Sequence, residues 1–318
     1  MIEKRKTIGC RLTIFTPVYN RAHCIEKCYK SLLRQKNQDF IWIIVDDGSD
    51  DGLSGLVQSW MDKGSNFRIE FYRKENGGIH TAYNLALSHV HTDYWVCIDS
   101  DDWLADNAVN IIYEGMKYCE KHQLNVCGMA GLDADPEGSI FGGEFPAVRT
   151  ASLMELKFLY KHRGDIKVVY RTASSAPFLP IPEIPGEKNF NPYYIMLQMD
   201  RTAPLLILNK VLCIVDYQED GMSANLFRQY EDSPVSFGMF RLQYLKMQGL
   251  PWRFRYKQWI HYVSSRLFAL EQHKGQLWKQ QKEGVPFRRL GIATAFLPGV
   301  LLYLYILMRN RLKKEKSS

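Results

Sequence analysis

The chain has 318 residues, 46% of them hydrophobic, which is enough for one large domain or two ordinary ones with a sizeable core. This composition excludes a disordered protein. The formal net charge is +7, and between residues 253 and 289 nine basic residues face only Glu271 and Glu283. A basic C-terminal part suggests an anionic surface as its neighbour.

Seven cysteines are scattered through apolar stretches, without the paired spacing of a zinc site or a disulfide scaffold. We interpret them as reduced core residues of a cytosolic protein. Cys24 and Cys28 lie one helical turn apart, but no second Cys or His pair is near them, which argues against a metal site there. The charged N-terminus lacks the apolar segment of a secretion signal.

Up to about residue 135, runs rich in β-branched and aromatic residues alternate with amphipathic runs. The first kind is almost continuously apolar, which is typical of strands buried on both faces. We predict strands at 11–19, 40–49, 67–74, 93–101 and 125–135, and helices at 25–36, 52–64, 81–90 and 107–122. The alternation predicts an α/β fold with a Rossmann-like, mostly parallel sheet covered by helices on both faces.

The stretch from about 131 to 194 is rich in Gly and Pro, and we expect irregular loops around a cleft there. Helical patterning returns at 192–200, 241–247 and 256–274. The chain therefore ends in a helical, basic C-terminal extension.

Two aspartate clusters follow strands of the predicted sheet. VDDGSDD follows the second strand, and IDSDD, with Asp99, Asp101 and Asp102, follows the fourth. Because ligands of open α/β sheets bind beyond the carboxyl ends of the strands, both clusters would face a ligand. Closely spaced carboxylates suit Mg²⁺ or Mn²⁺, which also binds substrate phosphates. Alternatively, one Asp or Ser of IDSDD caps the helix that starts near Asn107.

VDDGSDD has two interpretations of its own. The simpler one is a strand-to-turn transition with a capping Asp and with Gly48 at positive φ. In the functional one, an Asp accepts a hydrogen bond from a nucleobase N–H, and Tyr19 offers an aromatic face to the base. The motif alone is weak, because bacterial receiver domains also carry paired Asp after a strand.

Four ordered motifs together resemble the family 2 nucleotide-sugar glycosyltransferases of the A-type fold, in particular bacterial members that build surface polysaccharides. The motifs are TPVYNR, VDDGSDD, NGGIHTAYNLAL and IDSDD. The resemblance is strong over about 10–135 and fainter through GEKNFNPYY and YQEDGMSANLFRQY. It implies a catalytic domain at 1–230, with a nucleotide-sugar half at about 10–135 and an acceptor half at about 136–230. A helical membrane-associating region would follow at 231–318.

The resemblance also implies roles for single residues that bind the donor, a nucleoside-diphosphate sugar. Those at the base would be Thr16, Pro17 and Tyr19, which line its pocket, and Asp47, which hydrogen-bonds it. Those at the ribose, diphosphate and divalent cation (Mn²⁺ or Mg²⁺) would be Gly78 and His80, Asp99 at the ribose, and Asp101 as the metal ligand of a D-x-D motif.

The GGIHTAYN stretch departs from the family pattern at one position. Many relatives carry Lys where this chain has Ile79, so one phosphate contact is missing or comes from Arg73 or Lys74. A simpler interpretation of the stretch is a loop that leads into a helix, with Asn84 buried. For His80 the sequence does not distinguish this interpretation from a contact with the nucleotide.

A second departure concerns the general base. In the family it is an Asp or Glu just ahead of the helix that follows the loop, and Tyr193 occupies that position here. The nearest carboxylate is Glu187, which we predict as the base, with Glu183 as the alternative. A base must lie within hydrogen-bond reach of the hydroxyl that it deprotonates.

The resulting hypothesis is an inverting glycosyltransferase whose acceptor is a glycan or a lipid-linked molecule, with no nucleic acid involved. A nucleotidyltransferase is the first alternative, although such enzymes usually carry a Gly-rich loop with Arg or Lys where this chain has TPVYNRAH. A non-catalytic binding protein on the same fold is the second alternative, and Tyr193 is the feature in its favour.

The tail contains an uncharged run from Leu290 to Met308 between basic flanks. As a helix it would be about 28 Å long, barely the thickness of a bilayer core. Both flanks favour the cytoplasmic side, and Pro298 and Gly299 interrupt the run. We therefore predict a monotopic or peripheral protein on the cytoplasmic face of the cell membrane, attached by a shallow hairpin or an in-plane helix. The alternatives are a single span and a soluble core helix.

Overall fold

The structure, a computed structural model, describes residues 9–216, 226–274, 285 and 288–315. By internal packing the chain divides into two units. The sheet unit comprises Met1–Gly77, Thr81–Pro180 and Met199–Gln218, and the helical unit comprises Gly78–His80, Ile181–Gln198 and Glu219–Ser318. Most of the predicted acceptor-side motif YQEDGMSANLFRQY lies outside the described residues.

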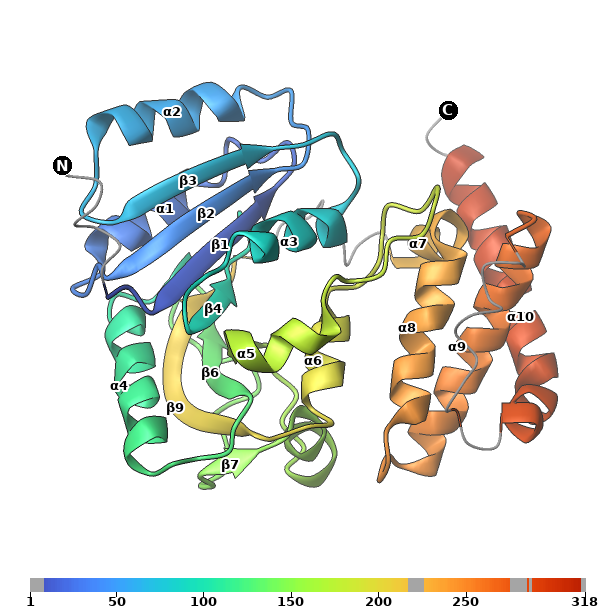
Figure 1. Cartoon of the computed structure of the whole chain (residues 1–318). Helices are drawn as coiled ribbons and strands as arrows, with labels where there is room; N and C mark the ends of the chain where they lie inside the picture. Colours follow the sequence, from blue (N-terminus) through green and yellow to red (C-terminus); the bar gives the residue numbers. More distant parts are fainter. Residues whose placement is uncertain (1–8, 217–225, 275–284, 286–287, 316–318) are drawn as a thin grey trace. The chain divides into compact units, whose positions relative to one another are not determined.

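The sheet unit is built on one mixed sheet, which has nine strands among the described residues (Figure 1). The strand order is β3-β2-β1-β4-β8-β6-β9-β5, with β7 beside β9. The bounds are β1 Leu12–Val18, β2 Phe40–Asp46, β3 Arg68–Arg73, β4 Tyr94–Cys97, β5 Trp103–Leu104, β6 Gly128–Ala134, β7 Thr150–Ala151, β8 Ile166–Arg171 and β9 Leu205–Ile214. The first four strands in chain order are parallel, and β8 is antiparallel to both β4 and β6. The predicted α/β fold is confirmed, but β8 lies where irregular loops were expected.

Helices cover both faces of this sheet, as the alternation predicted. On one face, Leu12, Ile14 and Val18 of β1 share a core with α1 (Glu26–Arg34), α2 (Leu53–Lys63) and α4 (Ala108–Lys121). The other face carries α3 (Ile79–Ser88) and α5 (Thr172–Ser175), and short helical turns lie at Glu155–Leu159 and Ala176–Phe178. There Phe15 packs edge-to-face on Tyr83 of α3, with ring centroids 4.9 Å apart.

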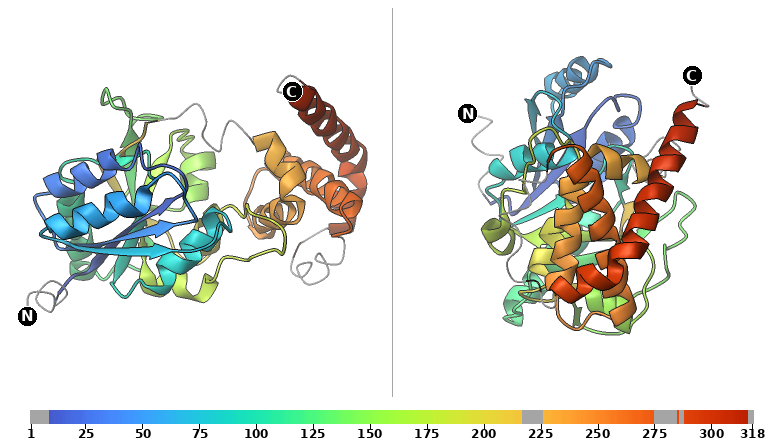
Figure 2. Two further views of the ribbon diagram at one scale, coloured as in Figure 1. Left: turned by 90° about the horizontal axis from the view of Figure 1, so that it is seen from above. Right: turned by 90° about the vertical axis from the view of Figure 1, so that its right-hand side faces the viewer.

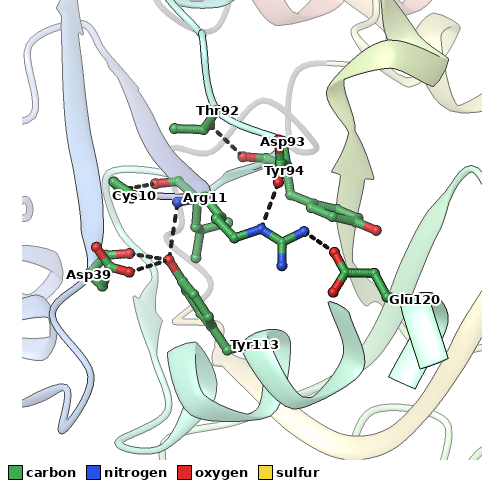
Figure 3. A network of polar contacts seen from close by, with 9 residues as sticks. Cys10, Arg11, Asp39, Thr92, Asp93, Tyr94, Tyr113 and Glu120 are labelled. Atoms are coloured by element: carbon green, nitrogen blue, oxygen red, sulfur yellow. Dashed lines mark hydrogen bonds and ion pairs between the residues drawn. The ribbon is translucent and has the colours of Figure 1, made fainter. Parts of the chain in front are cut away.

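A polar network closes the sheet at the end where β1 begins (Figure 3). The Arg11 guanidinium donates to Asp93 Oδ2 at 2.6 Å and also pairs with Glu120 of α4. The Tyr113 hydroxyl accepts a hydrogen bond from Arg11 N at 3.2 Å and donates to the Asp39 carbonyl oxygen at 2.6 Å. These contacts join β1 to α4 and to the residue before β4. The predicted ligand site lies at the opposite, carboxyl end of the strands.

The helical unit contains α6 to α10, with α8 packed on α9 and α9 packed on α10 (Figures 1 and 2). The bounds are α6 Tyr193–Met199, α7 Leu226–Asp232, α8 Pro234–Lys246, α9 Trp252–Glu271 and α10 Arg288–Glu315. Small residues let α10 approach α9 closely. A Cβ on Gly291 would lie 2.3 Å from the Trp259 ring, and one on Gly299 would lie 2.5 Å from Val263.

Helix α10 runs without a break through Pro298. Of the two attachments predicted for the tail, the hairpin is therefore not observed, and one continuous helix is present instead. By length and composition its stretch Arg288–Leu312 could cross a membrane, with a mean hydropathy of 2.0 in its most apolar window, although a buried core helix can pass the same test. Only 22% of its most apolar window is buried, however, so most of this surface is not covered by the described protein.

Candidate functional site

Hydrogen bonds join the loops that follow β1 and β2 at the carboxyl end of the sheet. The backbone N–H of Asn20 donates to Ser49 Oγ at 2.9 Å, and that of Asp50 donates to Asn20 Oδ1 at 3.0 Å. The N–H of Ala22 donates to Asp51 Oδ2 at 2.7 Å. The second half of the VDDGSDD motif thus holds the β1 loop in place, a role that the sequence analysis did not predict.

The three residues predicted to line the nucleobase pocket differ in exposure. Thr16 is buried, and its hydroxyl accepts a hydrogen bond from the indole N–H of Trp42 at 3.0 Å. Pro17 is buried as well, whereas the Tyr19 side chain, directly after β1, is 50% exposed. Stacking on a base requires an accessible aromatic face, and Tyr19 offers one.

Asp47, directly after β2, is buried and anchors the segment that leads into α3. Its Oδ1 accepts hydrogen bonds from Lys74 Nζ at 2.8 Å and from Gly77 N at 3.0 Å. Its Oδ2 accepts one from Asn76 Nδ2 at 3.2 Å, and Lys74 Nζ also donates to Thr81 Oγ1 at 2.8 Å. The carboxylate predicted to contact the base therefore already uses part of its hydrogen-bonding capacity within the protein.

Ile79, which stands where the resemblance expects Lys, begins α3. The two cations predicted to replace that Lys are both paired within the sheet unit. Lys74 bonds to Asp47, and Arg73 donates to the Ser49 carbonyl oxygen at 2.7 Å. A phosphate bound by either cation would have to compete with these partners.

Gly78 and His80 belong to the helical unit, where they contact the segment 187–190. Gly78 has a φ of 94°, and a Cβ on it would lie 1.7 Å from the Lys188 carbonyl oxygen, so glycine is required. His80 is buried, and its Nδ1 accepts a hydrogen bond from Phe190 N at 3.3 Å. Both residues thus hold the GEKNF loop, and their contact with a nucleotide stays a prediction.

The D-S-D-D turn after β4 separates its three carboxylates by exposure. Asp99 is exposed, Asp101 is half-buried and Asp102 is buried. Burial and the neighbouring charge of Asp99 raise the pKa of Asp101 above its ordinary value. Of the three carboxylates in this turn, the two accessible ones are those to which the resemblance gives the ribose and the metal.

Asp102 points into the protein. Its Oδ1 accepts a hydrogen bond from Asp216 N at 3.4 Å, and its Oδ2 lies 3.7 Å from Lys167 Nζ. The N-cap residue of α4 is Asn107, which makes no side-chain capping bond, so Asp102 has a different role from the predicted cap. Sequence analysis missed Lys167, whose only signal is one charge in an apolar stretch of IKVVYR.

The residues at this edge fit a divalent cation that is bound together with a diphosphate. Within the described part of the chain, no group of three or more His, Cys, Asp or Glu side chains could hold a metal by itself. Mg²⁺ and Mn²⁺ do not need one, because they take one or two carboxylates and complete their ligands with water and phosphate oxygens. Asp99 and Asp101 supply oxygen donors of that kind.

Glu187, the predicted general base, caps a helix. Its Oε1 accepts a hydrogen bond from Val235 N at 3.0 Å, and its Oε2 accepts one from Ser236 N at 2.7 Å. Lys274 Nζ lies 3.4 Å from Oε1, and the Glu187 side chain is 0% exposed. The N-terminus of α8 has unsatisfied N–H groups that favour a carboxylate. The structure therefore gives Glu187 a stabilising role, and its role as a base stays a prediction.

Residues 13–130 match the model of the family described as glycosyl transferase family 2. Glycosyltransferase GlyG of Streptococcus pneumoniae is 27% identical over 184 residues, which are 57% of this chain and 58% of GlyG. The teichoic acid poly(glycerol phosphate) polymerase of Staphylococcus epidermidis is 37% identical over 105 residues, 33% of this chain and 14% of the polymerase. The chain matches only 15% of another pneumococcal relative, glycosyltransferase GlyA.

Solved structures of glycosyltransferases share the fold. Residues 1–349 of S. aureus TarS in complex with UDP-GlcNAc align with a TM-score of 0.62 and 16% identity, covering 95% of this chain and 92% of that one. The mannosyltransferase PcManGT from Pyrobaculum calidifontis, in complex with GDP-Man and Mn²⁺, aligns with a TM-score of 0.53 and 14% identity, covering 93% and 87%. The chain therefore has the A-type glycosyltransferase fold.

Proposed function

We propose that this protein is a metal-dependent, inverting glycosyltransferase that moves a sugar from a nucleoside-diphosphate sugar to a hydroxyl of a lipid-linked or polysaccharide acceptor. The observation that carries the proposal is the D-S-D-D turn within a family 2 domain. Its Asp99 and Asp101 are accessible at the carboxyl end of β4, where open α/β sheets bind ligands.

Different residues of the chain bind different parts of the donor in this proposal. Tyr19 stacks on the base, Asp47 accepts its N–H, Asp99 binds the ribose, and Asp101 holds the divalent cation. When bound, that cation neutralises charge on the departing diphosphate. The acceptor hydroxyl loses its proton to a carboxylate and attacks the anomeric carbon from the face opposite the leaving group, which inverts the configuration.

The base in this proposal is Glu187, with Glu183 as the alternative. Glu187 would have to leave its cap on α8 to meet an acceptor, since both of its oxygens accept backbone N–H bonds. Glu183 is exposed. Tyr193, at the family's base position, lies at the start of α6 with its ring centroid 6.4 Å from that of Phe240.

The exposed face of α10 supports attachment to an anionic membrane surface. Large apolar side chains recur on it at spacings of three, four or seven, which places them along one side of a helix. The α10 stripe consists of Leu290, Leu297, Leu301, Leu304, Met308 and Leu312, each at least 46% exposed. Arg288, Arg289, Arg309 and Arg311 flank it, and cations at the ends of an apolar face suit anionic headgroups.

The opposite face of α10 favours an in-plane helix over a span. It packs on α9, which carries Arg255, Lys257 and Arg266. A span by α10 would draw these charges toward the hydrocarbon, at a cost of about 2.5–3.5 kcal/mol each at the bilayer centre. We therefore place the protein on the cytoplasmic face of the membrane, beside a lipid-linked acceptor.

The test of the function begins with binding. UDP, GDP and dTDP are screened by thermal shift with and without Mn²⁺, because specific binding raises the apparent stability by mass action. We expect one diphosphate to raise the melting temperature only when Mn²⁺ is present. The matching UDP-, GDP- or dTDP-sugars are then assayed for hydrolysis or transfer. Binding without turnover would favour the non-catalytic alternative, and no binding of any diphosphate would overturn the proposal.

A further inference from the structure

Lys167 is a buried cation that donor binding, as proposed, does not use. It lies on β8, next to β4 and β6 in the sheet, and its side chain is 12% exposed. Removing an ammonium group from water costs several kcal/mol unless anionic partners compensate for it. Anionic partners within the sheet unit must therefore compensate for the burial of the Lys167 ammonium group.

Three carboxylates attract this ammonium. Asp102 Oδ2 lies 3.7 Å from Lys167 Nζ, and the charges of Asp133 and Asp99 act on it as well. Asp133, on β6, is 3% exposed, and its Oδ1 has no hydrogen-bond partner among the described residues. Lys167 thus faces the inner side of the D-S-D-D turn, where Asp102 points, while Asp99 is exposed on the outer side.

Asp102 connects Lys167 to the backbone around the turn. Its N–H donates to the Asp99 carbonyl oxygen at 3.1 Å, which closes the turn that contains Asp101. Its Oδ1 accepts a hydrogen bond from the N–H of Asp216, just after β9. A carboxylate held by Lys167 on one oxygen and by a backbone N–H on the other keeps the turn in one conformation.

We propose that Lys167 is a positioning residue for the divalent cation. It commits Asp102 to the interior and so leaves Asp101 and Asp99 as the carboxylates available to the metal–diphosphate complex. This inference rests on the proposed function. Without Lys167, three carboxylates within four residues would repel one another, and Asp102 would no longer be fixed. Groups that orient metal ligands typically change metal affinity or activity by about 10–100-fold when they are removed.

The test measures Mn²⁺ binding directly, by electron paramagnetic resonance of free Mn²⁺ in the presence of UDP, of GDP or of dTDP. We expect Lys167→Met to raise the half-saturating Mn²⁺ concentration by about 10-fold or more. Lys167→Arg keeps the charge and should recover most of the affinity. Lys63→Met, which removes an exposed lysine at the end of α2, is the matched control and should leave the titration unchanged.

Asp102→Asn and the double variant Lys167→Met/Asp102→Asn show whether Lys167 acts through Asp102. If it does, the double variant shifts the Mn²⁺ titration no further than Lys167→Met alone. The double variant also removes the Asp102 charge that Lys167→Met leaves unpaired, so it is the protein to titrate if Lys167→Met does not fold.

The outcomes separate this inference from the proposed function. A Lys167→Met protein, or the double variant in its place, with a lower melting temperature but a wild-type Mn²⁺ titration would overturn the positioning role alone. A wild-type protein that binds no Mn²⁺ with any of the three nucleotides would overturn both.

Discussion

Asp101 is the residue at which the proposed chemistry is most sharply testable. It is half-buried in the D-S-D-D turn, and we expect Asp101→Ala to abolish turnover while the fold stays intact, because the metal loses its protein ligand. Donor hydrolysis or transfer with Mn²⁺ measures the effect. Asp106→Ala is the control, since Asp106 is in the same loop region but pairs with Arg34 on the surface. Near-wild-type activity of Asp101→Ala would remove the metal assignment.

Asp47→Ala should weaken binding of the preferred nucleoside diphosphate by about 1–3 kcal/mol, the cost of leaving a buried donor on the base unpaired. The structure adds a second effect, because Asp47 also anchors Lys74 and Gly77. Asn76→Ala separates the two, since it removes one anchor of this segment and keeps the carboxylate. Calorimetry should therefore show a much smaller loss of nucleotide affinity for Asn76→Ala than for Asp47→Ala. Equal losses would mean that Asp47 acts only through the segment 74–77.

At the scale of the element, helix α8 depends on the carboxylate that caps it. Glu187→Gln keeps the shape of the side chain but removes the charge that meets two N–H groups and Lys274. We expect unfolding free energy to fall by about 1–3 kcal/mol in urea denaturation. Lys274→Met is the matched variant, and it should lower the unfolding free energy less, because the two N–H bonds to Glu187 remain.

Glu187→Gln also tests whether Glu187 is the general base. Transfer is measured well below the lowered melting temperature, where the protein is folded. Loss of turnover there would identify Glu187 as the base. Full turnover of Glu187→Gln, combined with loss of turnover in Glu183→Gln, would assign the base to Glu183. Full turnover in both variants would show that neither carboxylate is the base.

His261 makes the helical unit sensitive to acid. Burial, and after it the charges of Arg241 and Lys257, lower the pKa of His261 to about 3. The unfolded chain has the ordinary value of about 6.5, so below that pH only the unfolded state gains the proton. This contribution to stability is therefore complete above pH 6.5, and about 2 kcal/mol of it is lost by pH 5.

Hydrogen exchange of α8 and α9 amides at pH 7 and pH 5 measures this contribution, after correction for the intrinsic exchange rates. His261→Gln, which keeps a polar partner for the Tyr230 hydroxyl, should flatten the difference between the two pH values. An identical pH dependence in both proteins would show that His261 takes up its proton over the same pH range in the folded and unfolded states.

The sequence predicted the elements whose signal is local. Strands β1, β2 and β4 are continuous apolar runs that end in polar turns, and their bounds in the structure lie within four residues of the predicted ones. Strand β8 was missed because Lys167 interrupts its apolar pattern within a segment rich in Gly and Pro. Its place between β4 and β6 depends on pairing with strands at least 30 residues away, which no local pattern contains.

At the scale of the whole molecule, the sequence predicted which carboxylates lie at the sheet edge better than it predicted each residue's contacts. Asp47 and the D-S-D-D turn follow strands, so their location could be inferred from the topology. The capping of α8 by Glu187 could not, because it joins residues 48 and 49 positions apart. Tertiary contacts of this kind decide which carboxylates are free for chemistry.

The proposed membrane attachment concerns the whole molecule, and the α10 stripe makes it testable by point substitutions. Truncation before Gly291 was the direct test suggested by the sequence, but it would also uncover Trp259 and Val263 of α9. We expect the full-length protein to sediment with vesicles that contain phosphatidylglycerol and to bind pure phosphatidylcholine vesicles more weakly, because the flanking arginines meet anionic headgroups.

The triple variant Leu297→Ser/Leu301→Ser/Met308→Ser removes three exposed side chains of the stripe and leaves the face packed on α9 intact. Each of these side chains contributes about 1.5–3 kcal/mol when it is fully buried in the apolar phase. Loss of even a part of these three contributions should weaken vesicle binding about tenfold or more. Size-exclusion chromatography tests the other occupant of such a face, a second copy of the chain. A wild-type dimer that ignores vesicles and becomes a monomer in the variant would assign the stripe to self-association. A protease-accessible C-terminus outside intact cells would instead establish a span, and would require α10 to separate from the charged helix α9 on which it packs.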